Sequence, residues 1–189
     1  MKTKQIRANE EKIIKLLRST NRPNMECLID WLCSTDYFTA PCSRKFHLCE
    51  KGGLIQHSLS VYNALNKLCD TFKIDIPKES KVIGALLHDV CKINLYKWNK
   101  EKKEYEYNNK TPLPIGHGEK SVILILRYIP LTDLEINMIR WHMTRYEEPF
   151  SKYQGNLQNV CKEAYMLYFA DHISTLYLEG DSWVIDGSY

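Results

Sequence analysis

The sequence predicts an all-α fold, a helical bundle with one small β-hairpin. Apolar residues recur at three- and four-residue steps along most of the chain, which is the period of amphipathic helices. Only 8 Gly and 7 Pro occur among 189 residues, few for a fold of strands and tight turns. A chain of this length buries a core without disulfide bonds. We therefore expect a single domain over residues 1–189, with N-terminal helices over about 1–35 and a core over about 40–178.

The first half of the chain predicts four helices. Charged residues alternate with isoleucine and leucine over 5–18, and a second amphipathic helix is expected over about 25–33. Gly52 and Gly53 open a long helix to about Phe72, and Pro77 opens another that ends near His88 and Asp89. One face of the long helix is expected to lie in the core, and it carries Leu54, His57, Val61, Leu65 and Leu68.

The second half predicts a hairpin followed by three more helices. Residues 95–108 alternate large and polar side chains around a charged turn, so we expect a β-hairpin whose aromatic residues stiffen it. A Pro- and Gly-rich loop over 111–118 leads into a helix to about Tyr128, and Thr132 caps a helix that ends near His142. Residues 145–156 predict a surface loop, and 157–178 a last helix. Its expected buried stripe comprises Val160, Ala164, Leu167, Tyr168, Asp171, Ser174 and Leu178.

The composition and charge of the sequence exclude several classes of protein. The net charge of +3 is too small for a dominant nucleic-acid surface, although it is compatible with anionic substrates. Seven cysteines, an odd number, favour reduced thiols, and no secretory signal opens the chain. The apolar run 122–126 is far shorter than the roughly 20 residues of a membrane span. We expect a cytoplasmic protein without a membrane anchor, and the sequence leaves its oligomeric state open.

Four histidines and two aspartates form the most informative pattern. They follow the order H…HD…H…H…D at intervals of 25 to 31 residues, which is about one helix and its connection. Successive helices can thus direct one ligand each towards a shared centre, unlike a zinc finger, whose ligands cluster in short pairs. The predicted metal ligands are His57, His88, Asp89, His117, His142 and Asp171.

Imidazole and carboxylate ligands suit divalent ions such as Fe, Mn, Zn, Co, Ni or Mg. The six residues can hold two ions if Asp89, beside His88, bridges them. Two ions about 3.5 to 4 Å apart can hold a hydroxide and bind phosphoryl oxygens, which favours phosphoester hydrolysis. Lys92 follows Asp89 by three residues, so its ammonium group can offset phosphate charge from the same helical turn. Arg44 and His47 are further candidates for substrate binding.

Five motifs resemble those of the HD-domain metal-dependent phosphohydrolase superfamily. The resemblance covers about residues 40–178, and it is closest to small stand-alone HD proteins of bacteria and phages. The GGL-x-x-H opening is also similar to the HD domain of certain bacterial 3′-to-5′ exoribonucleases. In order, the motifs are GGLIQHS, ALLHDVCKI, PIGHGEKS, IRWHM and YFADHIS.

The resemblance implies an HD-domain helical bundle and a role for each motif residue. His57, His88, Asp89 and Asp171 resemble the ligands of a first metal, with Asp89 as the bridging residue and catalytic centre. His117 and His142 resemble the additional ligands of dinuclear members, and Lys92 resembles the lysine of the HDxxK signature. Cys91 stands where many cyclic-nucleotide phosphodiesterases of the superfamily have glycine, and their GYP motif is absent. No oligonucleotide-binding domain precedes the motifs, unlike in the exoribonucleases.

The leading hypothesis is a phosphohydrolase that cleaves a phosphoester of a nucleotide or related compound through a metal-activated hydroxide. Nucleotidase, cyclic-nucleotide phosphodiesterase and short-oligonucleotide exonuclease activities all stay open at this stage. The alternative from another class is a non-hydrolytic HD module that senses a nucleotide or metal, or binds a partner. His172 neighbours Asp171 but points about 100° away around the helix, so we do not expect it to bind metal.

Overall fold

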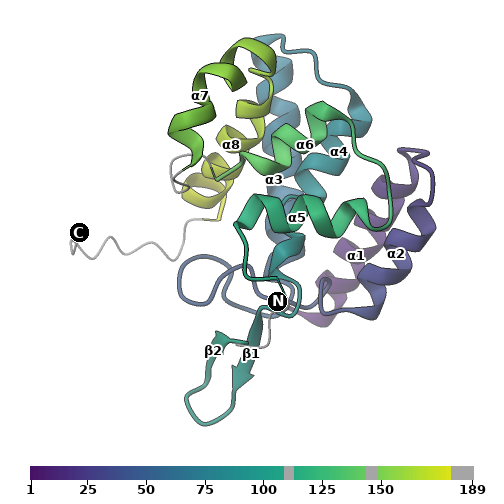
Figure 1. The fold of residues 1–189 in the computed structure, drawn as a ribbon. Coiled ribbons are helices and arrows are strands. Elements are labelled where there is room, and N and C mark those ends of the chain that lie inside the picture. Colours follow the sequence, from purple (N-terminus) through teal and green to yellow (C-terminus); the bar gives the residue numbers. More distant parts are fainter. Residues whose placement is uncertain (109–112, 144–148, 180–189) are drawn as a thin grey trace.

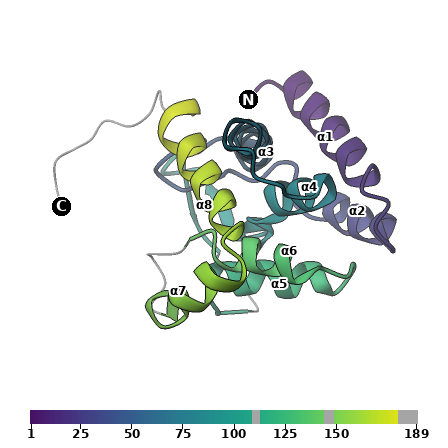
Figure 2. The same cartoon turned by 90° about the horizontal axis from the view of Figure 1, so that it is seen from above.

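The computed structural model describes residues 1–108, 113–143 and 149–179, and it is a helical bundle built around α3 (Gly53–Phe72). In Figure 2 α3 is seen nearly end-on, with α8 (Ala164–Ile173) on one side and α1 (Thr3–Arg18) on the other. The helix packs most extensively against α4 (Lys78–Leu87) and α8. The all-α class with one hairpin, predicted from the sequence, is confirmed.

The N-terminal helix α1 packs on α3 and α4, and the second helix packs on α1 (Figure 1). α1 buries Ile6, Ile13 and Leu17, which share one face, and α2 (Met25–Ser34) completes this side of the core. The start of α3 requires two glycines. Gly52 has a φ of +80°, which disfavours other residues, and a Cβ on Gly53 would collide with the carbonyl oxygen of Leu48. The loop that precedes α3 is thereby held against the helix start.

The α4 helix ends where the histidine–aspartate pair begins. His88 is its C-cap, and Asp89 leads into a single 3₁₀ turn, η1 (Val90–Lys92). The chain then forms the predicted antiparallel hairpin of β1 (Tyr96–Asn99) and β2 (Glu104–Tyr107), which extends away from the helices in Figure 1. Tyr96 pairs with Tyr107 and Trp98 with Tyr105, so aromatic rings face one another across the strands.

Two short helices follow the hairpin. α5 (His117–Leu126) begins at the predicted histidine, and part of the loop expected before it, 109–112, lies outside the described residues. α6 (Asp133–Arg140) begins at the predicted cap residue Thr132, which forms a capping box with Glu135. The Thr132 side chain accepts from the Glu135 amide, and the Glu135 carboxylate accepts from the Thr132 amide.

The C-terminal region differs from the prediction. A helix, α7 (Pro149–Val160), replaces the expected loop from residue 149 on and extends into the expected last helix, whereas 144–148 lies outside the described residues. Proline suits the first helical position because its missing N–H needs no partner there. The expected helix 157–178 is broken by a tight turn after Val160, and it continues as α8 and a π-helical segment, η3 (Ser174–Leu178).

The break changes which residues of the expected stripe are buried. Leu157 and Cys161 pack into the core on one side of the turn, and α8 then leaves in a new direction that buries Leu167 and Asp171. Val160 is 82% exposed and Leu178 58% exposed, so both were wrongly assigned to the core. A regular helix through 157–178 would have kept a single stripe, which the turn prevents.

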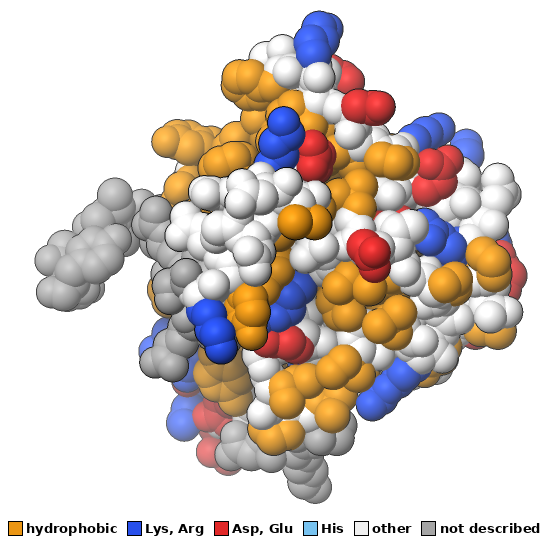
Figure 3. All heavy atoms as spheres, turned by 45° about the horizontal axis from the view of Figure 1, so that its top comes forward, with side chains coloured by type: hydrophobic (Ala, Val, Ile, Leu, Met, Phe, Trp, Pro, Cys, Tyr) orange, Lys and Arg blue, Asp and Glu red, His pale blue; other side chains and the backbone are white. Residues whose placement is uncertain are grey.

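The surface shows no single-sign charge patch on the face in Figure 3, where acidic and basic side chains are interspersed among apolar ones. This agrees with the small net charge of the sequence. Within the described ranges, each helix is too short or too polar to cross a membrane.

Candidate metal centre

The six residues predicted as metal ligands come together at one centre, and we call them the His/Asp cluster. His57 comes from α3, His88 and Asp89 from the end of α4, and His117 from the first turn of α5. His142 follows α6, and Asp171 comes from α8. Five of the six side chains are buried, and His117 is the partly exposed member. Residues up to 114 positions apart in the chain thus meet because each helix directs one face inward.

The two oxygens of Asp89 face different histidines. Oδ2 lies 3.4 Å from His88 Nε2 and 3.8 Å from His57 Nε2. Oδ1 lies 2.5 Å from His117 Nε2 and 3.6 Å from His142 Nε2. The carboxylate therefore stands between two pairs of imidazoles, which is the arrangement of a bridging ligand.

The first half of the cluster has the spacing of a metal site. His57 Nε2 lies 3.4 Å from His88 Nε2 and 3.1 Å from Asp171 Oδ1. Ligand atoms bound to one ion at about 2.1 Å lie roughly 3.0 to 3.4 Å apart at usual bond angles. The ligand atoms of His88, His142 and Asp171 also lie within 4.8 Å of one another. These distances need only small side-chain adjustments to hold an ion.

One buried nitrogen of the cluster supports this fit. Among the described residues, His142 Nε2 has no hydrogen-bond partner, while its Nδ1 lies 2.6 Å from the Ile139 carbonyl oxygen. A buried polar atom without a partner costs free energy. Because Nδ1 donates its proton to the Ile139 carbonyl oxygen, the lone pair of Nε2 is available to bind a metal ion. His88 is oriented in the same way, with Nδ1 2.9 Å from the Ala85 carbonyl oxygen. The residues present therefore fit divalent metal ions.

Charges in the metal-free cluster compensate one another. Burial alone would raise the pKa of Asp89, but Lys92, His88 and His117 hold it well below its usual range. Burial would lower the pKa of His117, but Cys91 and Asp89 raise it to about 10. The His57 pKa is also raised, because Cys42, Asp171 and Glu179 outweigh its burial. Protons thus occupy positions that metal cations would compete for.

Lys92 lies beside the cluster as the sequence predicts. Its Nζ is 2.6 Å from Asp89 Oδ2 and 3.6 Å from Cys42 Sγ. His47, a predicted substrate contact, also lies close, with its ring centroid 5.1 Å from that of His57. Arg44 is placed differently, because its guanidinium stacks over the Tyr107 ring of the hairpin at 5.5 Å. It therefore lies on the hairpin, whereas Lys92 and His47 adjoin the cluster.

Glu179 is the functional candidate that sequence reasoning missed. Both of its carboxylate oxygens lie 3.1 Å from His57 Nδ1, and its side chain is 3% exposed. A carboxylate behind a metal-binding histidine fixes the orientation of the ring and increases its basicity. Glu179 lies eight positions after Asp171, and no motif or periodicity marks it. Cys42 was missed in the same way, because the sequence indicated only that its thiol is reduced.

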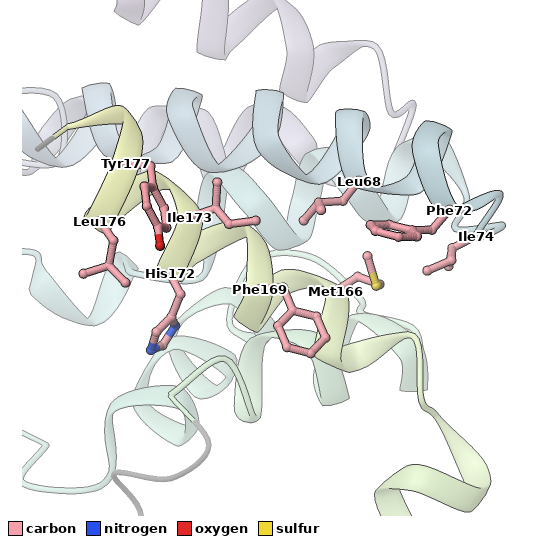
Figure 4. A pocket seen from close by; sticks show the side chains of 9 residues that line it. All are labelled: Leu68, Phe72, Ile74, Met166, Phe169, His172, Ile173, Leu176 and Tyr177. Carbon is pink, nitrogen blue, oxygen red and sulfur yellow. The ribbon is translucent and has the colours of Figure 1, made fainter.

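A separate apolar pocket of about 530 Å³ lies between the end of α3 and the α8–η3 segment. Figure 4 shows His172 as its one ionisable imidazole, among apolar and aromatic side chains. His172 Nδ1 lies 3.1 Å from the Tyr168 carbonyl oxygen, and the residue does not belong to the His/Asp cluster. The pocket lacks the polar groups that phosphate chemistry needs, so the candidate centre is the cluster.

The fold is an all-helical bundle, and it brings histidines and aspartates together at one buried centre. This combination is typical of helical proteins that bind metal ions. The family model of the HD domain matches residues 54–176, which is more than half of the chain. The protein therefore belongs to the HD-domain superfamily of metal-dependent phosphohydrolases. Neither the curated proteins nor the solved structures yielded a match. The similarity to exoribonucleases stays a prediction.

Proposed function

We propose that this protein is a divalent-metal-dependent phosphohydrolase that acts on a nucleotide or a related phosphoester. The observation that carries the proposal is the position of Asp89 between two pairs of imidazoles, with the Lys92 ammonium beside it. Membership of the HD-domain superfamily supports the same reaction class.

The cluster divides into two sets of ligands. His57, His88, Asp89 and Asp171 would hold one ion, and Asp89, His117 and His142 would hold a second. Ions bound there would neutralise charge on the phosphoryl group. They would also lower the pKa of a water molecule, so that hydroxide is available near neutral pH to attack phosphorus. The water oxygen would form the new P–O bond, the P–O bond to the leaving group would break, and the proton lost by the water would pass to the leaving-group oxygen.

The other side chains bind and orient the substrate. Burial would lower the pKa of Lys92, but Asp89 and Cys42 raise it well above its usual value, so the ammonium stays charged. It is the group that would bind a non-bridging phosphate oxygen. Arg44, stacked on Tyr107, would interact with a part of the substrate nearer the hairpin.

The test is a turnover screen of the full-length protein after chelation and reloading with Mn, Fe, Co, Ni, Zn or Mg. Substrates would include mononucleotides, cyclic dinucleotides and short RNA. We expect metal-dependent product release that is abolished in Asp89→Ala, together with lower metal content. Asp70→Ala is the matched control, because Asp70 is an exposed aspartate of α3.

Two results would contradict the proposal. Full activity and metal content in Asp89→Ala would remove the bridging role. Saturable nucleotide binding without turnover by any metal form would favour the alternative, a non-hydrolytic sensor or partner-binding module. Preference among the substrates would separate nucleotidase, cyclic-nucleotide phosphodiesterase and exonuclease activities.

A further inference from the structure

A second group of metal-ligating side chains lies beside His57. It consists of Cys42, His47 and Glu179, which we call the Cys/His/Glu group. Cys42 and His47 come from the loop that precedes α3, and Glu179 follows η3. The proposed hydrolysis uses none of the three as a ligand, so their convergence needs its own explanation.

The two distances from His47 Nε2 to its neighbours in the group are close to those around a tetrahedral ion. Cys42 Sγ lies 3.1 Å from His47 Nε2, which lies 3.7 Å from Glu179 Oε2. A tetrahedral zinc ion places its sulfur and nitrogen ligands roughly 3.6 Å apart and its nitrogen and oxygen ligands roughly 3.3 Å apart. Each observed distance differs from these values by about half an ångström or less, which small side-chain rotations can correct.

Burial and charge favour the same ion. Cys42 is fully buried, and the side chains of His47 and Glu179 are 12% and 3% exposed. A thiolate and a carboxylate together balance the charge of a dication, so the occupied group would bury no net charge. Burial raises the pKa of the Cys42 thiol to about 11, although the Lys92 ammonium 3.6 Å from Sγ lowers it in part, so a bound dication would displace the thiol proton. Sulfur and imidazole ligands select zinc over magnesium or calcium.

We propose that Cys42, His47 and Glu179 form a Zn²⁺ site distinct from the His/Asp cluster. Glu179 connects the two sites without belonging to the His/Asp cluster, because it accepts a hydrogen bond from His57 Nδ1 and faces His47 with the same carboxylate. In this assignment His47 is a metal ligand and not a substrate contact. The site does not depend on the proposed hydrolase activity.

The test is cobalt substitution of the full-length protein, because a thiolate bound to Co²⁺ produces a charge-transfer band in the near ultraviolet. We expect this band in the wild type and its loss in Cys42→Ser, together with one fewer zinc ion per chain. Cys91→Ser is the matched control, since Cys91 is a buried cysteine near Asp89 and His117. That variant should keep the band.

Other outcomes overturn the assignment. A wild type without the band, a band that persists in Cys42→Ser, or one that disappears in Cys91→Ser would each exclude Cys42 as the ligand. If Cys42→Ser does not fold, His47→Gln is the variant to test. We expect His47→Gln to lose the bound zinc, and full zinc retention in this variant would refute the site. A protein that shows the band but lacks phosphoester turnover would contradict the proposed function alone.

Discussion

Replacing Glu135, which is not a member of the His/Asp cluster, with alanine should destabilise the fold strongly. Glu135 is fully buried, and its Oε1 accepts hydrogen bonds from Arg22 at 2.5 Å and from Ser80 at 2.9 Å. Its Oε2 accepts from the Thr132 amide at 2.8 Å. One carboxylate therefore joins α6 to α4 and to the connection between α1 and α2.

The expected loss of unfolding free energy follows from the buried groups that lose their partner when Glu135 is replaced. Arg22 is 15% exposed, and Ser80 is buried, so neither regains full hydration when the carboxylate is removed. Removing one partner of a buried ion pair costs about 3 to 5 kcal/mol. For a chain of this size that lowers the midpoint of thermal unfolding by roughly 10 °C. Glu135→Gln keeps the shape and an acceptor oxygen, so its loss should be smaller.

The measurement is urea unfolding followed by circular dichroism, with chelator present so that metal content is equal. The control is Glu26→Ala, which breaks an Arg18 ion pair whose side chains are both more than half exposed. We expect the free energy of unfolding to fall in the order wild type, Glu135→Gln, Glu135→Ala, with Glu26→Ala close to wild type. If Glu135→Ala lost no more stability than Glu26→Ala, the carboxylate would not be the link between these helices.

Three further predictions concern the centre and its support. Glu179→Gln should weaken metal binding by about 10- to 100-fold, measured by competition with a chromogenic chelator, because His57 loses its carboxylate partner. Unchanged affinity would exclude that role. Tyr37→Phe should cost about 1 to 3 kcal/mol in urea unfolding, because the buried Tyr37 hydroxyl donates to the Leu86 carbonyl oxygen at 2.5 Å; equal stability would show that water replaces the hydroxyl. Burial lowers the pKa of His47 from 6.5 to about 4, so the unfolded chain binds more protons between these values. The stability of the metal-free protein should therefore fall as pH decreases from about 6.5 to 4, on the order of 3 kcal/mol, and the same slope in His47→Gln would refute the assignment.

The sequence predicts the helices and their buried faces, because both depend on helical periodicity. It does not predict the features that form where the chain departs from that periodicity. His57 and Asp171 could be assigned to buried faces because each lies in an amphipathic helix, and both side chains are buried in the structure. The turn after Val160 could not be predicted, since it forms to pack Leu157 and Cys161 against other helices. The contact between Glu179 and His57 spans 122 residues and has no local signal.

The adjacent pair His88 and Asp89 explains why the centre forms at a helix end. Neighbouring residues in a regular helix point about 100° apart, so they cannot both reach one centre from its middle. Here α4 ends at Leu87, His88 keeps helical angles, and Asp89 adopts φ −105° and ψ 16°. That change turns the carboxylate back towards His57 and His117, while the 3₁₀ turn brings Lys92 onto Asp89 Oδ2. The end of α4 is thus the structural condition for one carboxylate to face both halves of the cluster.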